Sequence, residues 1–400
     1  MHTAKGEKEV LNKDEFFHLP IYPTEKCWER KSQEKWNQIA KPLYSLGKFE
    51  PCLNKIAAIK KTTEFSLSKR AILVMCADNG IVEEGVTQTD SEVTRIVAEN
   101  MAKGISSVCK MAQVTNTQVI PVDIGMFHPV SHEGMRQWAV AAGTKNFLTS
   151  PAMTEEQMLA AIERGIRLVK QCKEEGCDIL GTGEMGIGNT TTSTAVICGV
   201  LGLSPEKITG RGAGLSDEGL QRKITVIKTA LEKYDDDFEN VESTKNIRNP
   251  ENQENIQNAG KKLGDKKISP EKAAKILQCV GGLDIAGLTG VFLGGAIYGV
   301  PVVLDGIITA AAALIAACLY PETKMYMLAS HCSKEPSMKM VMDFLELEPV
   351  LYADMALGEG TGCAMMFGAL DMVHSIYRQN VTFSDIAVDA YEDFTAQECE

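Results

Sequence analysis

The residues best suited to chemistry in this 400-residue chain are concentrated in three glycine-rich stretches, of which the first covers residues 181–196. It follows an apolar run of strand length and opens a helical pattern. Glycines at such a turn let backbone N–H groups approach an anion, and the helix N-terminus adds partial positive charge. The residues that we expect to bind a phosphate-bearing substrate here are Gly183, Glu184, Gly186, Gly188, Asn189 and Thr190.

This first stretch departs from both common nucleotide-binding motifs. Asn189 stands where a P-loop requires lysine, so a triphosphate would lack its counter-charge. Residues 181–186 satisfy the spacing of a dinucleotide turn, but Glu184 lies inside it, where a carboxylate opposes a pyrophosphate. The stretch therefore favours a monophosphate attached to a hydroxyl-bearing group, such as ribose, that Glu184 can hold. A glycine-rich turn needed only for strand–helix packing is the alternative.

The second stretch, residues 209–223, combines small residues with Arg211 and Lys223. Accessible backbone N–H groups beside cations are typical of phosphate sites. Alone, this stretch fits a structural turn equally well; together with the first, it gives two candidate anion-binding loops in one acidic protein. Its expected substrate-binding residues are Gly210, Gly212, Gly214 and Lys223.

The third stretch, residues 355–367, supplies the candidate catalytic group. Glu359 lies between Gly358 and Gly360, just before a helical pattern that runs to about residue 378. Flanking glycines let a planar ligand approach and leave the carboxylate partly desolvated, which raises its pKa toward that of a useful general base. We therefore expect Glu359 to be catalytic and its two glycines to border the substrate. An ordinary helix-entry turn is the alternative.

The apolar pattern predicts an α/β framework that positions these stretches. Near-continuous apolar runs alternate with helical stretches, which indicates a parallel sheet with helices on both faces. The expected strands cover residues 70–80, 117–125, 177–186, 299–306 and 325–331, and the expected helices cover residues 90–112, 154–174, 190–202, 272–280, 284–297, 307–319 and 335–346. Ligands bind beyond the carboxyl ends of such strands. Asp78, Asp305 and Ser330 end strands and are therefore further expected substrate-binding residues.

The chain is expected to divide into three parts. Residues 1–65 are amphipathic and helical in pattern. Residues 66–375 form the predicted catalytic domain, within which residues 233–268 are a polar insertion with few apolar side chains to bury. Residues 376–400 comprise the end of the last helix and an acidic tail.

Composition excludes several function classes. The formal net charge is −12, and this negative field disfavours nucleic acids and anionic membranes as partners. The first residues are charged where a signal peptide is apolar, and the apolar run 307–319 is shorter than the ~18 residues that span a bilayer. The twelve cysteines form no CxxC pair and no zinc-type group, which favours reduced, buried thiols in a cytoplasmic protein.

Eight blocks, in unbroken order over roughly residues 25–378, carry a family resemblance. They are ILVMCADNGIVEEGVTQTDSEVT, AAGTKNFLTSPAMT, GTGEMGIGNTTT, GRGAGL, GGLDIAGLTGVFLGGA, PVVLDGIITAAAAL, ASHCSKEP and MALGEGTGCAMM. Together they resemble the nicotinate-nucleotide–dimethylbenzimidazole phosphoribosyltransferases, which build the nucleotide loop of cobalamin.

The resemblance implies a Rossmann-like sheet, a small helical domain built from the terminal segments, and a homodimer. It implies transfer of the phosphoribosyl group of nicotinate mononucleotide to 5,6-dimethylbenzimidazole or a related base, with inversion at C1′ and release of nicotinate. Glu359 is then the general base, and Glu184 lies near the ribose. The loops at 183–192 and 210–215 bind the phosphate, with Lys223 following them. Because the donor is a monophosphate, neither a metal nor a cofactor is expected.

Three positions depart from, or vary within, the family's pattern and bear on the base pocket. Asn79 replaces the histidine of the family's Ala-Asp-His-Gly, Val97 is apolar where some relatives carry glutamine, and Thr89 supplies a hydroxyl group seen in relatives. The preferred base therefore stays open. Two rival functions are an NAD-dependent oxidoreductase that uses the turn at 181–186 and a non-catalytic nucleotide-binding regulator.

Overall fold

A six-stranded sheet organises the chain in the computed structural model, which describes residues 11–246 and 268–394. The strand order is β3-β2-β1-β4-β5-β6, and every neighbouring pair is parallel. This order is typical of doubly wound nucleotide-binding sheets. The strands are β1 (Arg70–Ala77), β2 (Gln118–Gly125), β3 (Arg136–Gln137), β4 (Ile179–Met185), β5 (Val302–Leu304) and β6 (Met327–Ala329).

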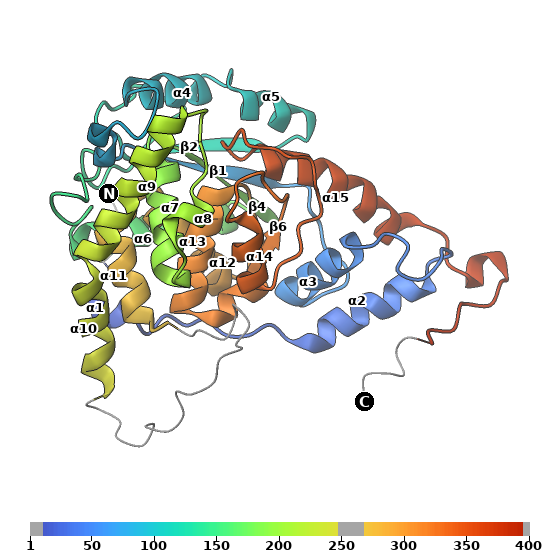
Figure 1. Cartoon of the computed structure of the whole chain (residues 1–400). Coiled ribbons are helices and arrows are strands. Elements are labelled where there is room, and N and C mark those ends of the chain that lie inside the picture. Colours follow the sequence, from blue (N-terminus) through green and yellow to red (C-terminus); the bar gives the residue numbers. More distant parts are fainter. Residues whose placement is uncertain (1–10, 247–267, 395–400) are drawn as a thin grey trace, which may run out of the picture.

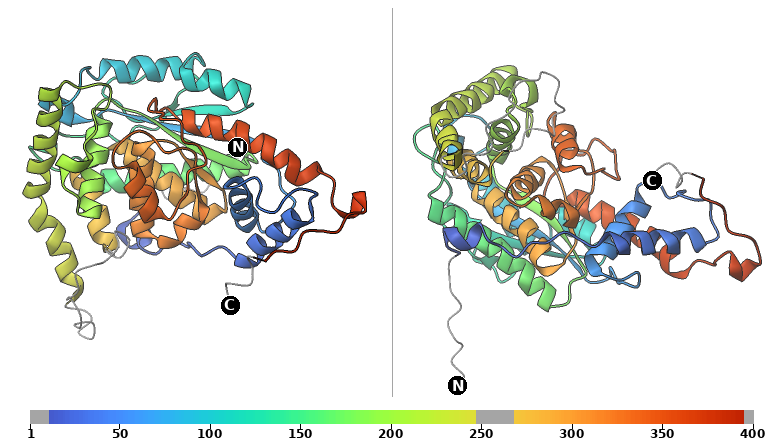
Figure 2. Two further views of the ribbon diagram at one scale, coloured as in Figure 1. Left: turned by 45° about the vertical axis from the view of Figure 1, so that its right-hand side comes forward. Right: turned by 90° about the horizontal axis from the view of Figure 1, so that it is seen from below.

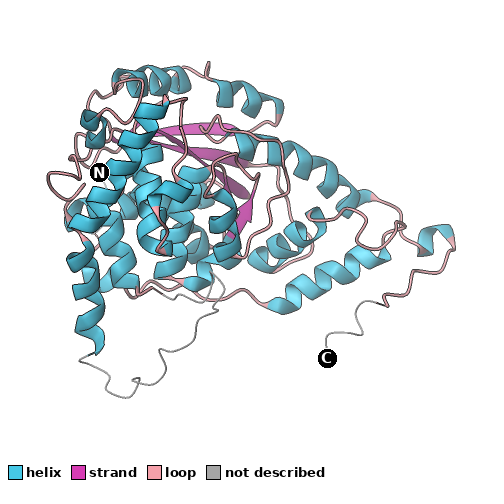
Figure 3. Ribbon diagram, viewed as in Figure 1, coloured by secondary structure: helices cyan, strands magenta, loops and turns pink. Residues whose placement is uncertain are grey.

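The central strand β1 explains why the expected strands are apolar without alternation. All of its residues are buried. Leu73 and Met75 belong to one hydrophobic cluster, and Ile72 and Val74 to the other. Side chains on both faces of the strand are therefore covered, as helices on both sides of the sheet in Figure 3 indicate. The predicted α/β fold with a parallel sheet covered on both faces is confirmed.

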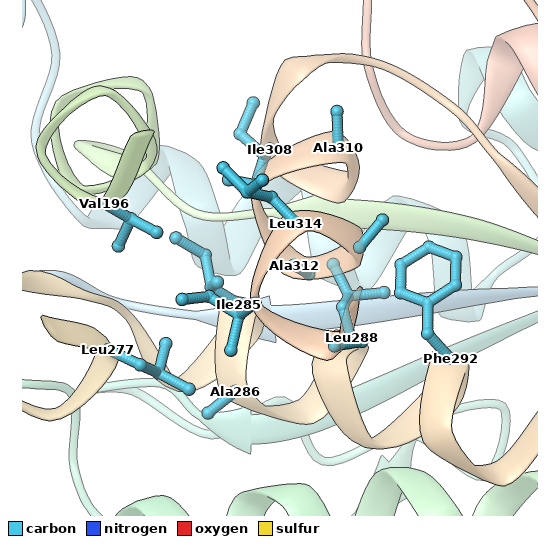
Figure 4. Packing of buried hydrophobic residues seen from close by; sticks show 14 of the residues in the cluster. Val196, Leu277, Ile285, Ala286, Leu288, Phe292, Ile308, Ala310, Ala312 and Leu314 are labelled. Carbon is cyan, nitrogen blue, oxygen red and sulfur yellow. The ribbon is translucent and has the colours of Figure 1, made fainter. Parts of the chain in front are cut away.

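One face of the sheet carries a layer of strongly apolar helices. Every residue of α13 is buried, so the apolar run 307–319 is an internal helix. Leu288 and Phe292 of α12 belong to the same buried cluster as Leu314 of α13 (Figure 4). The helices of this layer are α6 (Glu155–Glu174), α7 (Asn189–Leu201), α11 (Pro270–Val280), α12 (Leu283–Tyr298) and α13 (Ile307–Leu319).

The opposite face is covered by α4 (Glu92–Ala102), α5 (Ser107–Val114) and α15 (Thr361–Gln379). The N-terminal helices α2 (Lys26–Gln38) and α3 (Phe49–Lys60) lie beside α15 in Figures 1 and 2. The rings of Trp36 and Tyr377 are 4.8 Å apart, and Ser32 Oγ lies 2.9 Å from the Tyr377 hydroxyl oxygen. Segments from both ends of the chain thus pack together, while the division into domains stays a prediction.

The remaining elements connect these layers. They are α1 (Lys13–Phe16), η1 (Gly80–Glu84), α8 (Pro205–Ile208), α9 (Asp217–Lys233), α10 (Asp235–Asn246), η3 (Pro321–Tyr326), α14 (Met338–Leu345) and η4 (Ser384–Ile386). Within the described ranges, no helix combines the length and apolar character needed to cross a bilayer.

Three local features differ from the sequence-based expectations. The helical stretch 90–112 is two helices, because Gly104 adopts a φ of 73° between them. Strand β3 is too short to give an apolar pattern. The expected polar insertion begins at the end of α9 and includes helix α10; Tyr234, just before α10, and Phe238, within it, are buried. Residues 247–267 lie outside the described ranges.

Candidate active site

A pocket of about 280 Å³ lies where loops follow the carboxyl ends of β4, β5 and β6. Ligands of doubly wound sheets bind at this edge. The expected residues that line it are Glu184, Gly186, Asn189, Thr190, Gly212, Gly358 and Glu359. The other lining residues are Val97, Met185, Ile187, Ala213, Gly306, Ile307, Ile308, Thr309, His331, Ser333, Glu335, Ala356 and Leu357. The fold therefore brings parts of all three glycine-rich stretches together.

Two helices begin at this pocket. Gly188 precedes α7 and Gly306 precedes α13, and neither N-terminus has a side-chain cap. Residues 189–190 and 307–309 line the pocket. The first N–H groups of a helix have no partner within the helix, and the dipole makes this end positive, so both ends suit an anion. Sequence reasoning missed the second helix end; its signal is an Asp-Gly pair directly before an apolar helix.

Lys223, the last residue of the second glycine-rich stretch, provides a cation close to the pocket. Its side chain is buried, and its ammonium group donates to Thr190 Oγ1 at 2.9 Å and to the Gly210 carbonyl at 3.2 Å. Burial lowers the pKa of Lys223 to about 8, and the charge of Glu335 opposes this shift. Because Thr190 and Glu335 both line the pocket, the ammonium group lies next to the two candidate anion-binding loops.

Glu359 occupies a tight turn with left-handed backbone. Gly358, Glu359 and Gly360 have φ values of 79°, 61° and 94°. One carboxylate oxygen, Oε2, is buried without a hydrogen-bond partner in the described part of the chain. Burial raises the pKa of Glu359, the backbone N–H of Val108 lowers it, and the charge of Asp305 raises it further. The turn thus holds a partly desolvated carboxylate that can take up a proton.

Asp305 holds this turn against the end of β5. The Gly360 N–H donates to Asp305 Oδ2 at 3.0 Å, and the Gly362 N–H donates to Oδ1 at 2.6 Å. Burial raises the pKa of Asp305, whereas the charge of His331 and these backbone donors lower it. Asp305 does not line the pocket, although the sequence predicts it to contact substrate. Its observed contacts fix the backbone beside Glu359.

Other expected substrate-binding residues also lie outside the pocket lining, namely Asp78, Thr89, Gly183, Gly188, Gly210, Gly214, Lys223, Ser330 and Gly360. Asp78 is buried, and its Oδ2 accepts a hydrogen bond from the Phe127 N–H at 2.8 Å. The buried Ser330 hydroxyl donates to the Leu304 carbonyl at 2.6 Å. Thr89 lies on an exposed loop. Asp78 and Ser330 therefore support the strand ends, and Thr89 is not among the residues that line the pocket.

Glu184 is buried in a group of carboxylates. Asn189 Nδ2 donates to Glu184 Oε2. Burial raises the pKa of Glu184 to about 8, the charge of Asp284 adds to this shift, and the Asn189 amide opposes it. Burial also raises the pKa of Asp284 to about 6. Sequence reasoning missed Asp284, whose signal is a lone carboxylate at the start of the apolar helix α12.

The expected glycines serve two different purposes. A methyl group at Gly183 would lie 2.6 Å from the Glu359 carbonyl oxygen, so this glycine lets strand β4 pack against the turn at Glu359. A methyl group at Gly210 would collide with Glu335 Oε2. Neither glycine lines the pocket. Glycines that instead supply a positive φ are Gly188 at 90°, Gly212 at 54°, Gly214 at 99°, Gly358 at 79° and Gly360 at 94°.

The combination of these groups suits a reaction on an anionic, hydroxyl-bearing substrate. The two helix N-termini and Lys223 supply positive charge for the anion. Glu184 supplies a polar contact at the end of β4, and Glu359 supplies a candidate general base from the third stretch.

Comparison with known proteins identifies related sequences over most of the chain. A family model described as a phosphoribosyltransferase matches residues 21–249 and 251–388. A nicotinate-nucleotide–dimethylbenzimidazole phosphoribosyltransferase of Acetivibrio thermocellus is 39% identical over 360 residues, which cover 90% of this chain and 93% of that protein. A protein of the same name from Ruminiclostridium cellulolyticum is 37% identical over 363 residues, covering 91% and 94%.

A solved structure also matches the fold. The crystal structure of CobT from Thermus thermophilus superimposes with a TM-score of 0.77 at 30% sequence identity. The match covers 91% of this chain and 99% of that one. The similarity therefore extends over nearly the whole related structure.

Proposed function

Because this chain belongs to the nicotinate-nucleotide–dimethylbenzimidazole phosphoribosyltransferase family, we propose that it transfers the phosphoribosyl group of nicotinate mononucleotide to 5,6-dimethylbenzimidazole or a related base. The products are α-ribazole 5′-phosphate and nicotinate. The observation that carries this proposal is the Glu359 carboxylate, which has an unpartnered buried oxygen in the pocket where helices α7 and α13 begin.

The phosphate group is held by the two helix N-termini and by Lys223. The backbone N–H groups of Thr190 and of residues 307–309 are available to phosphate oxygens, whereas the Asn189 N–H donates to the Gly186 carbonyl at 3.1 Å. Lys223 carries its charge at neutral pH, because its pKa of about 8 is above 7. These contacts fix the ribose so that C1′ is in line with the attacking base, which lowers the entropic part of the barrier.

Glu359 acts as the general base in the transfer. One ring nitrogen of the incoming base attacks C1′ as the carboxylate removes the proton from the other ring nitrogen. The C1′–N bond to nicotinate breaks, and its electron pair returns to the pyridine nitrogen, so the leaving group needs no proton. Attack on the face opposite the departing nicotinate inverts the β linkage to α. Glu184, which is protonated at neutral pH, donates a hydrogen bond to a ribose hydroxyl.

The direct test combines purified protein with nicotinate mononucleotide and dimethylbenzimidazole and measures released nicotinate by chromatography. Glu359→Gln should lower kcat by about 10²- to 10⁴-fold while the affinity for the mononucleotide stays near that of the wild type. Glu335→Gln is the matched control, because it removes a carboxylate from the same pocket but from the side near Lys223. We expect this control to change the KM for the mononucleotide more than kcat.

Two outcomes would contradict the proposal. If the wild-type protein releases no nicotinate with any benzimidazole or purine base, the proposed activity is wrong. An unchanged kcat in Glu359→Gln would remove Glu359 from its role. A panel of bases also identifies the preferred acceptor, for which Val97 in the pocket lining is an apolar contact.

We also propose that the chain acts as a homodimer in the cytoplasm. Support for the dimer comes from the family's implied assembly and from exposed apolar side chains on α15, where Met365 is 46% and Met372 is 68% exposed. Support for the compartment comes from the cysteines, which are all free thiols in the described part of the chain.

A further inference from the structure

A second cavity, of about 580 Å³, lies between α3 and the edge strand β6. It shares no lining residue with the candidate active site. Ligand-binding pockets have volumes of about 300–1,000 Å³ and mostly apolar walls. The apolar wall of this groove is formed by Pro51, Cys52, Met327, Leu328, Ala329 and Leu347.

Lys55 is the charged group of this groove that lacks a partner. Glu346 forms an ion pair with Lys324 at 2.6 Å, and Glu348 lies 3.5 Å from Lys48. By contrast, Lys55 makes no hydrogen bond or ion pair with any described residue. Lys55 also lines a neighbouring cavity of about 500 Å³, which shares Pro51 and Glu346 with the groove.

An ammonium group among apolar walls loses hydration without gaining an internal anion, which costs free energy. Such a group is a candidate for binding a ligand that supplies the missing charge. We propose that this groove binds a small aromatic monocarboxylate, with its carboxylate on Lys55 Nζ and its ring against the apolar wall formed by α3 and β6. Because the other charged groups that line the groove, Lys48, Glu346 and Glu348, have partners, the one unpaired cation matches one anionic group on an apolar body.

The protonation of Lys55 gives this site a pH dependence. Burial lowers the pKa of Lys55 to about 8, while the thiol of Cys52 and the charges of Glu29 and Glu346 oppose the shift and Lys324 adds to it. Lys48, which also lines the groove, carries a positive charge and is paired with Glu348. Lys55 is therefore mostly charged at pH 7 and mostly neutral at pH 9. Affinity for a carboxylate should fall as the pH rises through about 8.

The test is calorimetric titration of the full chain with 1-naphthoate, using 1-naphthalenemethanol as the uncharged probe of similar shape. We expect naphthoate to bind at one site, the alcohol to bind at least tenfold more weakly, and Lys55→Met to weaken naphthoate binding by about tenfold to a hundredfold. Lys55→Arg, which keeps the charge, should retain most of the affinity. The wild-type titration at pH 7 and pH 9 tests the same group even where the methionine variant folds poorly.

Further variants test whether the probe binds in this groove and not in the active site, and whether Lys55 in particular is responsible. Lys223→Met should leave naphthoate binding unchanged, and excess nicotinate mononucleotide should not displace the probe. Lys48→Met removes a cation that is already paired and should change affinity by less than Lys55→Met. The inference is overturned if naphthoate does not bind, if Lys55→Met binds as the wild type does, if the alcohol binds equally well, or if the mononucleotide displaces the probe.

Discussion

Glu184 and Glu359 are two carboxylic acids in one pocket, and their surroundings affect their pKa values differently. Burial and the charge of Asp284 raise the pKa of Glu184 to about 8, so this group is protonated at pH 7. The pKa of Glu359 is also raised by burial, but the backbone N–H of Val108 favours its charged form. A pair of titratable groups with separated pKa values is typical of acid and base roles in one site.

The pH dependence of kcat tests this separation. At saturating substrate, kcat should rise with pH as Glu359 loses its proton, and fall above about pH 8 as Glu184 loses its own. Glu184→Gln keeps a hydrogen-bond donor that does not titrate. We therefore expect this variant to retain the acid limb of the profile and lose the alkaline limb. If kcat of Glu184→Gln still falls at high pH, the alkaline limb belongs to another group, such as Lys223.

The sequence predicts several residues that line this pocket, and their roles stay predictions. Glu359, Asn189 and Thr190 are predicted because their types and glycine neighbours carry a chemical meaning within a few positions of the chain. Asp305 is predicted as a substrate contact, yet its carboxylate accepts the N–H groups of Gly360 and Gly362. Such roles depend on which distant backbone faces a side chain, and no local pattern records this.

At the scale of elements, the contact between strand β4 and the turn before α15 fixes where Glu359 lies. A methyl group at Gly183 would approach the Glu359 carbonyl carbon to 2.7 Å and the Gly360 nitrogen to 2.9 Å. Backbone atoms cannot yield as a flexible side chain does. The turn would have to move as a unit, and the carboxylate would move with it.

Gly183→Ala should therefore lower kcat by about 10²-fold, the order expected for a displacement of about 1 Å in a catalytic group. Gly368→Ala is the matched control within α15, because its added methyl group meets only Thr115 Cγ2 at 3.4 Å. This control should keep kcat and raise the free energy of unfolding by about 0.5–1 kcal/mol. Steady-state kinetics and thermal melting of both variants measure the effects. Equal kcat values in the two variants would contradict the proposed positioning role of this contact.

Helices and strands are predicted correctly from the sequence where their buried apolar pattern extends over many residues. β1, α6 and α13 match their expected ranges closely because their apolar runs or periodicity extend over many residues. Strand β3 has two residues, neither of them buried, and so gives no pattern. Helix α10 buries Phe238, but its neighbours in the sequence are acidic. Composition alone therefore predicts a solvated segment there.

At the scale of the whole molecule, segments from both ends of the chain pack together, but apolar side chains on α15 stay exposed. The packing of Trp36 against Tyr377 covers the C-terminal part of this helix. Met365 and Met372 remain exposed and, at a separation of seven residues, lie on the same side of the helix. Exposed apolar side chains that share one helix face are typical of surfaces that pack against a partner.

Met372→Glu should therefore weaken the proposed dimer, because a carboxylate buried in an apolar contact must be desolvated or the contact must open. Light scattering of the wild type should give twice the chain mass of 43.5 kDa, and the variant should shift toward one chain mass on dilution. Tyr22→Glu is the control, since Tyr22 is 70% exposed but lies in the N-terminal segment before α2. A monomeric wild type, or a dimer that Met372→Glu leaves intact on dilution, would exclude this face of α15 as the contact between two copies.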